Sequence, residues 1–408
     1  MSVPGAVPLV SGADVESAAQ LLDGVVRRTP LEHSRALAER VGGPVWLKCE
    51  NLQRTGSFKI RGAYTRIARL SDAERARGVV AASAGNHAQG VALAARELGA
   101  AATVFMPESA PLPKVAATRG YGADARLGGE TLTEAIVSAV EFADRTGSVF
   151  IHPFDHPDVI AGQGTVGLEV LEQCPDVATV VVCTGGGGLV SGIAAAVKAR
   201  RPGVRVVAVQ AAMAAAFPAS LTAGRPVPLT TMATMADGIA VAAPGDLTLA
   251  HVSGLVDDVV TVSEGELSRA LLFCLERAKL VVEPAGVAAV AALLADPAAF
   301  APPVVAVVSG GNIDPVLMMK VVQHGMAAAG RYLSLRVQVP DRPGSLAGLL
   351  RELAGLAANV LSVEHERLTP RLVLGEVEVG VHLETRGPDH AEHVLAALAA
   401  AGYAPRVD

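Results

Sequence analysis

Lys59 occupies a position from which a lysine can do chemistry. The residues just before it, Thr55-Gly56-Ser57-Phe58, include types that commonly begin a helix. Apolar residues then recur at helical spacing, at Ile60, Ala63, Tyr64, Ile67 and Ala68. The pattern predicts an amphipathic helix from Ser57 to about Leu70, with Lys59 in its first turn. Because the helix dipole favours anions at this end, an ammonium there needs a negative group nearby.

Two interpretations of Lys59 are open at this point. It is either a solvated surface lysine, as most lysines are, or a lysine whose partly deprotonated amine holds an aldehyde cofactor as a Schiff base. In the second case an anion of the cofactor would lie close to the helix start. The segment alone favours the surface lysine, and the rest of the chain reverses that order.

A glycine-rich junction offers a place for such an anion. Thr184-Gly185-Gly186-Gly187-Gly188-Leu189 lies between an apolar strand and a predicted helix, where several backbone N–H groups can point at one spot. A flexible linker is the ordinary alternative, but linkers do not normally sit at a strand-to-helix junction. No Gly-Lys-Ser/Thr follows, which excludes a Walker loop. The lack of GxGxxG, together with Gln210 at the end of the next strand, disfavours a dinucleotide site. The run therefore predicts a phosphate monoester site.

Two more loops follow predicted strands. Ser83-Ala84-Gly85-Asn86-His87 opens a helix, so its N–H groups can receive an anion, and Ser309-Gly310-Gly311-Asn312 follows the apolar run 304–308. Glu283 precedes Pro284 in a third segment. The ordinary alternatives are a capped turn for the first loop, a surface histidine at His87, a tight turn for the second loop and a helix-start acid at Glu283. We do not expect His87 to be a catalyst.

In combination and in this order, these segments resemble the threonine dehydratases among the fold-type II pyridoxal-phosphate enzymes, from about Arg28 to Ala328. The resemblance implies that Lys59 binds pyridoxal 5'-phosphate and, once freed, removes the Cα proton of the substrate. It implies a cofactor site of Phe58, Lys59, Asn86, Gly185, Gly186, Gly187, Gly188, Leu189, Glu283, Ser309 and Gly310. It implies a clamp for the substrate carboxylate at Ser83, Ala84, Gly85, Asn86 and His87.

Two positions refine the expected chemistry. The resemblance places the Ser309 hydroxyl against the ring nitrogen of the cofactor, where a neutral group cannot hold the ring protonated as a carboxylate would. The weaker electron sink favours loss of a β-leaving group over transamination. Related serine racemases carry a serine acid where this chain has Ala84, so elimination is expected over racemisation.

One departure from the family concerns metal. Related enzymes often have a cation site of acidic residues after the strand that ends here at Gln210. This chain continues Ala211-Ala212-Met213-Ala214-Ala215-Ala216, without a carboxylate. Hard cations need several oxygen ligands, so we predict no metal.

Composition limits the class of protein. A chain of 408 residues is expected to form two or three domains. No apolar run approaches the roughly 20 residues of a membrane span, and residues 1–11 do not resemble a signal peptide, so we expect a cytoplasmic protein. Net charge is −6 without a basic tract, which argues against nucleic acid as a partner. The scattered cysteines are expected to be reduced and buried: Cys49, Cys174, Cys183 and Cys274.

The order of elements indicates the fold class. Helices are expected at 14–22 and 34–41, and short apolar strands alternate with helical patterns throughout the region that bears the motifs. The predicted strands are 45–49, 79–82, 102–106, 179–183, 205–210, 256–262 and 304–308. Such an order indicates α/β architecture with parallel sheets covered on both faces. The resemblance adds a tryptophan-synthase-β-like arrangement of two αβα domains, with a catalytic region at 1–328 and a small subdomain at about 52–150.

After about Ala328 the pattern changes. Strict alternation at 333–339, a helix after Asp341-Arg342-Pro343-Gly344-Ser345, two more strands, a helix and a last short strand give the ferredoxin-like order βαββαβ. Residues 331–408 resemble an ACT domain, an amino-acid-sensing unit whose loop at 341–345 would meet the carboxylate of a ligand. Such domains usually bind ligand where two copies pair, which implies a homodimer or homotetramer. A purely structural dimerisation unit is the alternative.

The expected function is deaminating β-elimination of L-threonine to 2-oxobutanoate and ammonia, with L-serine as a slower substrate that gives pyruvate. The resemblance also suggests a role in isoleucine biosynthesis and allosteric control by isoleucine or valine. The alternatives are a serine or hydroxyaspartate dehydratase, threonine synthase, a β-replacing synthase and a catalytically silent amino-acid sensor.

Overall fold

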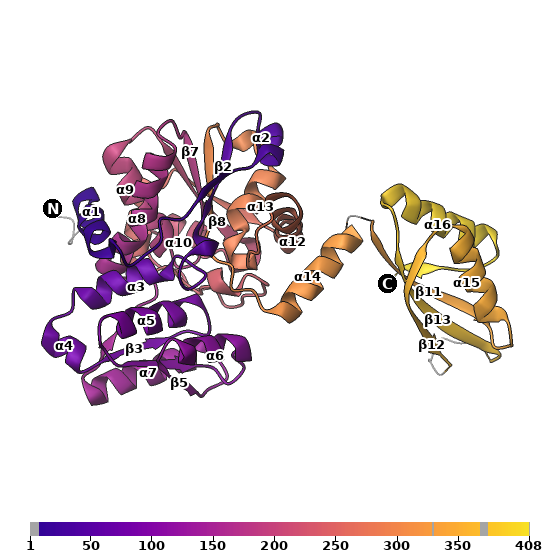
Figure 1. Ribbon diagram of the computed structural model, residues 1–408, viewed down its shortest axis with the longest axis horizontal. Helices are drawn as coiled ribbons and strands as arrows, with labels where there is room; N and C mark the ends of the chain where they lie inside the picture. The colour runs from indigo at the N-terminus through magenta and orange to yellow at the C-terminus, as the bar shows by residue number, and fades with distance from the viewer. Residues whose placement is uncertain (1–7, 329, 368–373, 408) are drawn as a thin grey trace. The chain divides into compact units, whose positions relative to one another are not determined.

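The apolar segments predicted as strands form the centres of two separate sheets in residues 1–314, one of the two compact units of the chain (Figure 1). The computed structural model describes residues 8–328, 330–367 and 374–407. The larger sheet has the order β1-β2-β10-β7-β8-β9 and the smaller one β5-β4-β3-β6. We call the elements around them the larger and the small subdomain.

The larger sheet confirms most of the predicted strands. Its strands are β1 (Leu31–His33), β2 (Val45–Cys49), β7 (Thr179–Cys183), β8 (Arg205–Ala211), β9 (Asp258–Val262) and β10 (Val304–Val308). Every residue of the central strands β7 and β10 is buried, as continuous apolar runs in a covered parallel sheet should be. One edge of the sheet departs from the parallel pattern, because β1, which was not predicted, pairs antiparallel with β2. Its three residues are too few to show a pattern.

Helices of the larger subdomain pack on both sides of these strands. They are α1 (Gly12–Leu22), α2 (Arg35–Val41), α8 (Pro157–Gln173), α9 (Gly188–Arg200), α10 (Phe217–Ala223), α11 (Asp246–Leu255), α12 (Glu264–Phe273) and α13 (Ala288–Ala295). Short turns η1 (Glu50–Leu52), η3 (Asp237–Ile239), η4 (Cys274–Ala278) and η5 (Pro284–Gly286) connect some of them. The four cysteines are buried and free, as predicted.

The small subdomain lies below the larger one in Figure 1. Its strands are β3 (Val79–Ala82), β4 (Ala102–Met106), β5 (Asp124–Leu127) and β6 (Val149–Phe150), all paired in parallel. Its helices are α3 (Lys59–Ala68), α4 (Asp72–Ala76), α5 (Asn86–Glu97), α6 (Leu112–Gly120) and α7 (Leu132–Thr146). Ile60, Ala63 and Ile67 of α3 enter the core of this subdomain, which confirms the apolar stripe. The helix begins at Lys59 instead of Ser57, because Ser57 is held in an antiparallel bridge to Gly310.

Residues 315–408 form the second compact unit. It contains α14 (Pro315–Ala328), β11 (Tyr332–Pro340), α15 (Ser345–Gly355), β12 (Asn359–Glu366), β13 (Glu376–Glu384), α16 (Pro388–Ala400) and β14 (Arg406–Val407). Its antiparallel sheet has the order β12-β13-β11-β14, and β11 to β14 follow the predicted order βαββαβ. Alternate residues of β11, such as Leu335 and Val337, fill the core. The boundary predicted at 328–331 stays a prediction, since contacts divide the chain at 314/315 and group α14 with this unit.

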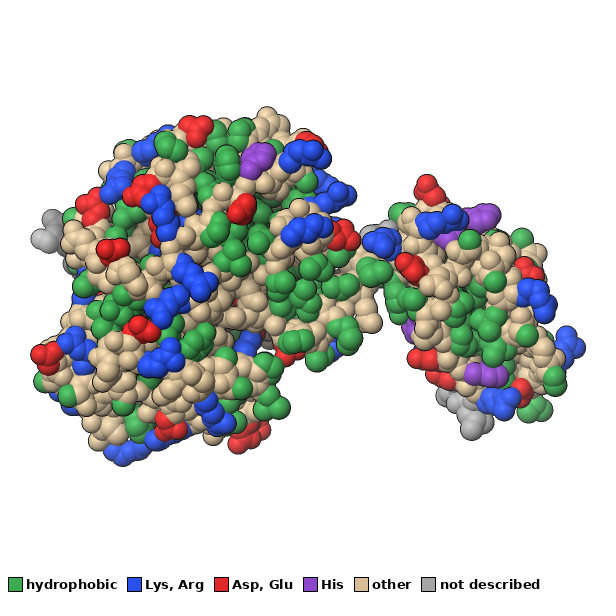
Figure 2. Space-filling model, in the orientation of Figure 1, with side chains coloured by type: hydrophobic (Ala, Val, Ile, Leu, Met, Phe, Trp, Pro, Cys, Tyr) green, Lys and Arg blue, Asp and Glu red, His purple; other side chains and the backbone are tan. Residues whose placement is uncertain are grey.

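No helix in the described residues is long and apolar enough to cross a membrane. On the face shown in Figure 2, basic and acidic side chains are interspersed over the unit formed by residues 1–314. That face presents no broad field of one sign.

Candidate active site

Lys59 is the first residue of α3, and backbone contacts fix its position. The Phe58 N–H donates to the carbonyl of Ser309 at 3.3 Å, which joins the helix start to the loop after β10. The Lys59 Nζ donates to the carbonyl oxygen of Pro153 at 2.9 Å. The side chain is half-buried, so the solvated surface lysine is wrong. Burial lowers the pKa of Lys59 to about 8, against the opposing charge of Glu283.

The glycine run joins β7 to α9, as predicted, and neighbouring aromatic rings leave it no space for side chains. A Cβ on Gly186 would lie 2.4 Å from the ring of Phe154, and one on Gly187 would lie 2.7 Å from Cζ of Phe217. Gly187 also has a φ of 95°, which a side chain would strain. Because α9 begins at Gly188, the first N–H groups of that helix lack intrahelical partners. The loop is thus a narrow cradle of backbone donors suited to a phosphate.

Asn86 and Glu283 are joined by a hydrogen bond. The Asn86 Nδ2 donates to Oε1 of Glu283 at 2.5 Å, and its Oδ1 accepts from Nδ2 of Asn312 at 2.8 Å. Asn312 also donates to the carbonyl of Thr55 at 2.7 Å. Gly310 leaves room for this contact, since a Cβ there would lie 2.1 Å from Glu283 Oε1. A continuous set of hydrogen bonds therefore runs from the segment before Lys59 to Glu283.

Glu283 is buried and strongly perturbed. Burial, followed by the negative charge of Asp237, raises the pKa of Glu283 to about 7, while Lys114, Asn86 and Lys59 oppose the rise. The carboxyl precedes the turn η5, so it is also a helix-start acid, as the ordinary alternative proposed. A carboxyl with this pKa can change its protonation state near neutral pH.

The loop at Ser83–His87 leads into α5, as predicted. The Gly85 N–H donates to Oγ of Ser83 at 3.1 Å, and Ala84 lies half-buried beside them. His87 is only 4% exposed, so the surface histidine is wrong. Its Nε2 lies 2.8 Å from the carbonyl oxygen of Ile151, which can only accept, so Nε2 carries the proton. Burial and the charge of Lys59 lower the pKa of His87 to about 3, which keeps the ring neutral.

Ser309 directly follows the buried strand β10 and is itself buried. Its N–H donates to the carbonyl of Gly286 at 3.2 Å, and its hydroxyl interacts with the thiol of Cys183. The structure therefore brings Lys59, Asn86, the glycine run, Glu283 and Ser309 to one place. The loop at 341–345 lies in the other compact unit, between β11 and α15, where Asp341 pairs with Arg367 at 3.4 Å.

Several residues of the site were not predicted. Asn312 ends a motif of which only Ser309 and Gly310 were assigned to the site, and Phe154 lies in a segment without a recognised pattern. Lys114 of α6 pairs with Asp237 of η3 at 2.7 Å, although 123 positions separate them. His152 accepts from the Asp155 N–H at 2.7 Å and has a pKa of about 4, lowered mainly by burial. The contacts of Asn312, Phe154 and Lys114 depend on tertiary folding and leave no local signal.

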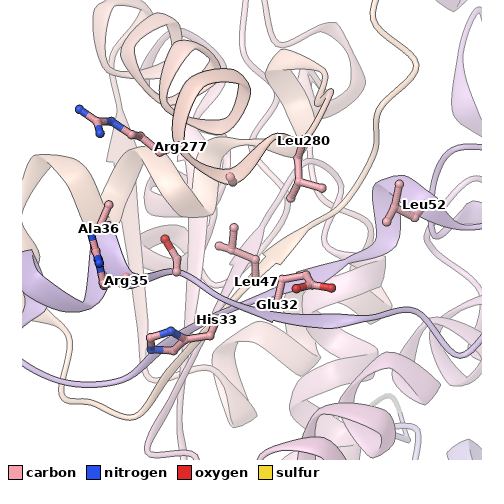
Figure 3. Close-up of a pocket in the computed structure, with 10 residues that line it drawn as sticks. Glu32, His33, Arg35, Ala36, Leu47, Leu52, Arg277 and Leu280 are labelled. Atoms are coloured by element: carbon pink, nitrogen blue, oxygen red, sulfur yellow. The ribbon is translucent and has the colours of Figure 1, made fainter.

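A separate pocket of about 490 Å³ lies elsewhere on this unit (Figure 3). Its lining combines charged residues such as Glu32, Arg35 and Arg277 with Leu47 and Leu52. It includes neither Lys59 nor the glycine run.

Comparisons with known proteins agree with this geometry. A family profile described as "Pyridoxal-phosphate dependent enzyme" matches residues 22–310. L-threonine ammonia-lyase of Thermotoga maritima is 48% identical over 399 residues, which cover 98% of this chain and 100% of that protein. Processed threonine deaminase isoform 2 of Solanum lycopersicum is 36% identical with a TM-score of 0.73, covering 79% of this chain and 98% of that one. Maize serine racemase is 35% identical with a TM-score of 0.74, and the match covers 79% of this chain and 99% of that one.

Proposed function

The chain belongs to the pyridoxal-phosphate-dependent enzymes, and on that premise we propose that it is an L-threonine ammonia-lyase. It would convert L-threonine to 2-oxobutanoate and ammonia, and L-serine more slowly to pyruvate. The observation that carries the proposal is the position of the Lys59 amine, which donates to the carbonyl of Pro153, next to the Phe154 ring that packs against the glycine run. Its pKa of about 8 leaves the amine partly deprotonated at neutral pH. Identity of 48% with a threonine ammonia-lyase over nearly the whole chain supports the substrate.

The residues present fit pyridoxal 5'-phosphate. Gly185–Gly188 would take the phosphate, since side chains there would collide with Phe154 and Phe217. Lys59 would hold the aldehyde carbon, while Asn86 and Ser309 would contact the ring. Phe58, Leu189, Glu283 and Gly310 would complete the walls. When bound, the cofactor supplies an electron sink for the pair of electrons left when the Cα proton is removed.

Lys59 would move that proton. A lysine of ordinary pKa is almost fully protonated at neutral pH and cannot accept a proton, whereas one near 8 is partly a free base. Pro153 orients the amine through its carbonyl. Burial of Lys59 thus makes it a suitable base at neutral pH.

Two side chains would direct the outcome toward elimination. Ser309 presents a neutral hydroxyl, which does not hold a ring nitrogen protonated as a carboxylate does. Ala84 has no proton to give to the opposite face of the substrate. His87 cannot replace it, because its pKa of about 3 leaves the ring neutral and Nε2 is bound to Ile151. The Ser83–His87 loop would hold the substrate carboxylate at the N-terminus of α5.

The second unit would be an ACT domain that binds an amino-acid effector at 341–345 and mediates homo-oligomer formation. The observed order βαββαβ supports this, as does the position of the loop at the start of α15. We keep the catalytic region at 1–328, the small subdomain at about 52–150, the ACT domain at 331–408 and a cytoplasmic location as predictions.

Keto-acid release from L-threonine by the purified, cofactor-loaded protein tests the proposal. L-serine and hydroxyaspartate serve as competing substrates for the two dehydratase alternatives, and release of inorganic phosphate from O-phospho-L-homoserine tests the threonine synthase alternative. Fastest turnover of L-threonine is expected. Bound cofactor without keto acid from any of these substrates would overturn it and point to a β-replacing enzyme. A colourless protein that never binds the cofactor would point to a silent sensor.

Isoleucine and valine added to the same assay test the second unit. A change in the threonine response of the full chain that is lost in a chain ending at Ala328 would support an effector site. Thermal melting of the shortened protein controls for its folding. An unchanged response to both amino acids in the full chain would contradict control by either of them.

A further inference from the structure

An ion pair joins the two subdomains beside the Ser83–His87 loop. Nζ of Lys114, on α6 of the small subdomain, lies 2.7 Å from Oδ2 of Asp237, on the turn η3 of the larger one. The Lys114 side chain is 12% exposed and that of Asp237 is 59% exposed. The Asp237 carboxylate is therefore open to solvent, whereas the Lys114 side chain is largely shielded from it.

The turn that carries Asp237 is packed against the candidate active site. A Cβ on Gly238 would lie 2.9 Å from Cβ of Ala285 and 4.0 Å from Oε1 of Glu283. A Cβ on Gly185, in the glycine run, would lie 2.9 Å from Cα of Ile239. Each residue of this short turn thus touches a different part of the site or its surroundings. A shift of the turn would therefore change its contacts with all of these parts of the site.

On the side of the small subdomain, Lys114 lies close to the Ser83–His87 loop. A Cβ on Gly85, in the Ser83–His87 loop, would lie 4.0 Å from Nζ of Lys114. The ammonium therefore lies over the loop that opens α5, while its counter-ion belongs to the turn beside the glycine run. We propose that Lys114 and Asp237 are a positioning pair for the reaction: their ion pair fixes η3 and the small subdomain around Glu283 and Lys59. This inference rests on the proposed function and adds residues to it.

The charges of the pair also act on Glu283. The groups that face this carboxyl are Asp237 from η3, Lys114 from α6, Asn86 from α5 and Lys59 from α3. Asp237 raises the pKa of Glu283, whereas Lys114 lowers it. Loss of either charge therefore shifts the titration of Glu283, and the two losses shift it in opposite directions. A pair too far from Glu283 to act on its charge would not produce opposite shifts.

The test compares Lys114→Met, Asp237→Asn and the double variant with the wild-type protein. Lys198→Met is the matched control, because Lys198 and Asp257 pair at the same distance of 2.7 Å in the larger subdomain. We expect each single variant to lower kcat/KM for L-threonine about fivefold, the double variant to lose no more than either single one, and Lys198→Met to match the wild type.

A second readout does not depend on turnover. The visible absorbance of the bound cofactor is titrated against pH, and the midpoint of its pH-dependent change is followed, because the cofactor would lie beside Glu283. Asp237→Asn should move the midpoint to lower pH, Lys114→Met should move it to higher pH, and the double variant should return it toward the wild-type value.

Three results would overturn the proposal: losses that add in the double variant, shifts of the midpoint in the same direction, or an equal loss in Lys198→Met. Failure of the proposed function looks different. The wild-type protein would then release no keto acid from L-threonine, while the opposite shifts of the absorbance midpoint would still appear.

Discussion

Two lysines close together in the sequence show how one fold treats buried ammonium groups in different ways. Lys48, on β2, donates to the carbonyl of Thr29, to Glu169 and to Gln173, at 2.9, 2.5 and 2.8 Å. All three of its donors are satisfied. For Lys59 one acceptor, the carbonyl of Pro153, lies within hydrogen-bond distance among the residues that the structure describes. Burial lowers the pKa of both lysines, but at Lys48 the Glu169 carboxylate in direct contact and the charge of Glu50 oppose the shift.

The surroundings of Lys48 form a closed network. Arg61 donates from Nε and Nη2 to the two oxygens of Glu50, each at 2.8 Å, and from Nη1 to Glu169 at 2.7 Å. Burial by itself would raise the pKa of Glu50, but the guanidinium of Arg61 brings it below its ordinary value. Arg61 is two residues after Lys59, so the network also anchors the helix that presents Lys59. The ammonium of Lys48, whose donors are all paired, belongs to a structural network. The amine of Lys59, whose donors are not all paired, can react.

Replacement of Lys59 tests the reactive side of this comparison and should have the largest effect. Lys59→Ala is expected to lower threonine turnover about a thousandfold or more, because the proton would lose its acceptor. Keto-acid release measures the loss of turnover. Thermal melting checks that the variant folds, and its melting temperature should stay close to that of the wild type. Substantial residual turnover would mean that another group removes the proton.

Replacement of Arg61 tests the structural side. Arg61→Met should lower the free energy of unfolding by about 3–5 kcal/mol, because Glu50 would be left buried without its partner. Urea unfolding followed by circular dichroism measures this. Arg69→Met is a control, since Arg69 pairs with Asp158 at 2.7 Å but is partly exposed. Equal destabilisation by both variants would contradict the special role of the buried network.

The glycine run offers a third test, of the cradle beside Lys59. Gly186→Ala would place a Cβ 2.4 Å from the Phe154 ring, so affinity for pyridoxal 5'-phosphate should fall about tenfold or more. Absorbance titration of the apo-protein measures the dissociation constant. Gly203→Ala is the matched control, because a Cβ there meets no atom within 4 Å. Unchanged affinity in Gly186→Ala would mean that the run does not hold the phosphate.

The pKa of Lys59 predicts a smaller effect of pH on stability. Its folded-state pKa of about 8 is lower than that of an unfolded lysine, so the unfolded chain binds more protons between about pH 8 and 10.5. Stability of the apo-protein from this group should therefore rise with pH across that window, by less than about 1.4 kcal/mol per pH unit. Lys59→Met should remove this rise in unfolding experiments. An identical pH dependence in both proteins would mean that Lys59 titrates normally.

The sequence predicted those parts of the molecule that are encoded locally. The fully apolar runs of β7 and β10 fixed the larger sheet, and the glycine run could be placed because it joins a strand to a helix. β1 and β5 were not predicted, since three residues at one edge and the mixed sequence Asp124–Leu127 carry little pattern. The predicted helix start at Ser57 was wrong because a bridge to Gly310, far along the chain, keeps Ser57 extended.

The candidate site divides in the same way. Lys59 and Asn86 stand in local motifs, so their residue types and their helix starts could be read directly. The burial of a residue could not be read from its motif. Burial is what makes His87 a neutral core residue and gives Glu283 a pKa of about 7. The contact between Lys114 and Asp237 joins two subdomains and depends on the complete fold.

Chemical trapping of the cofactor tests the difference between the two lysines most directly. The cofactor-loaded protein is treated with borohydride, which makes the bond to the lysine permanent, and its peptides are mapped by mass spectrometry. We predict the added pyridoxyl mass on Lys59 and none on Lys48. The mass on Lys48 or on any other lysine in place of Lys59, or no label on a protein that binds the cofactor, would contradict the account.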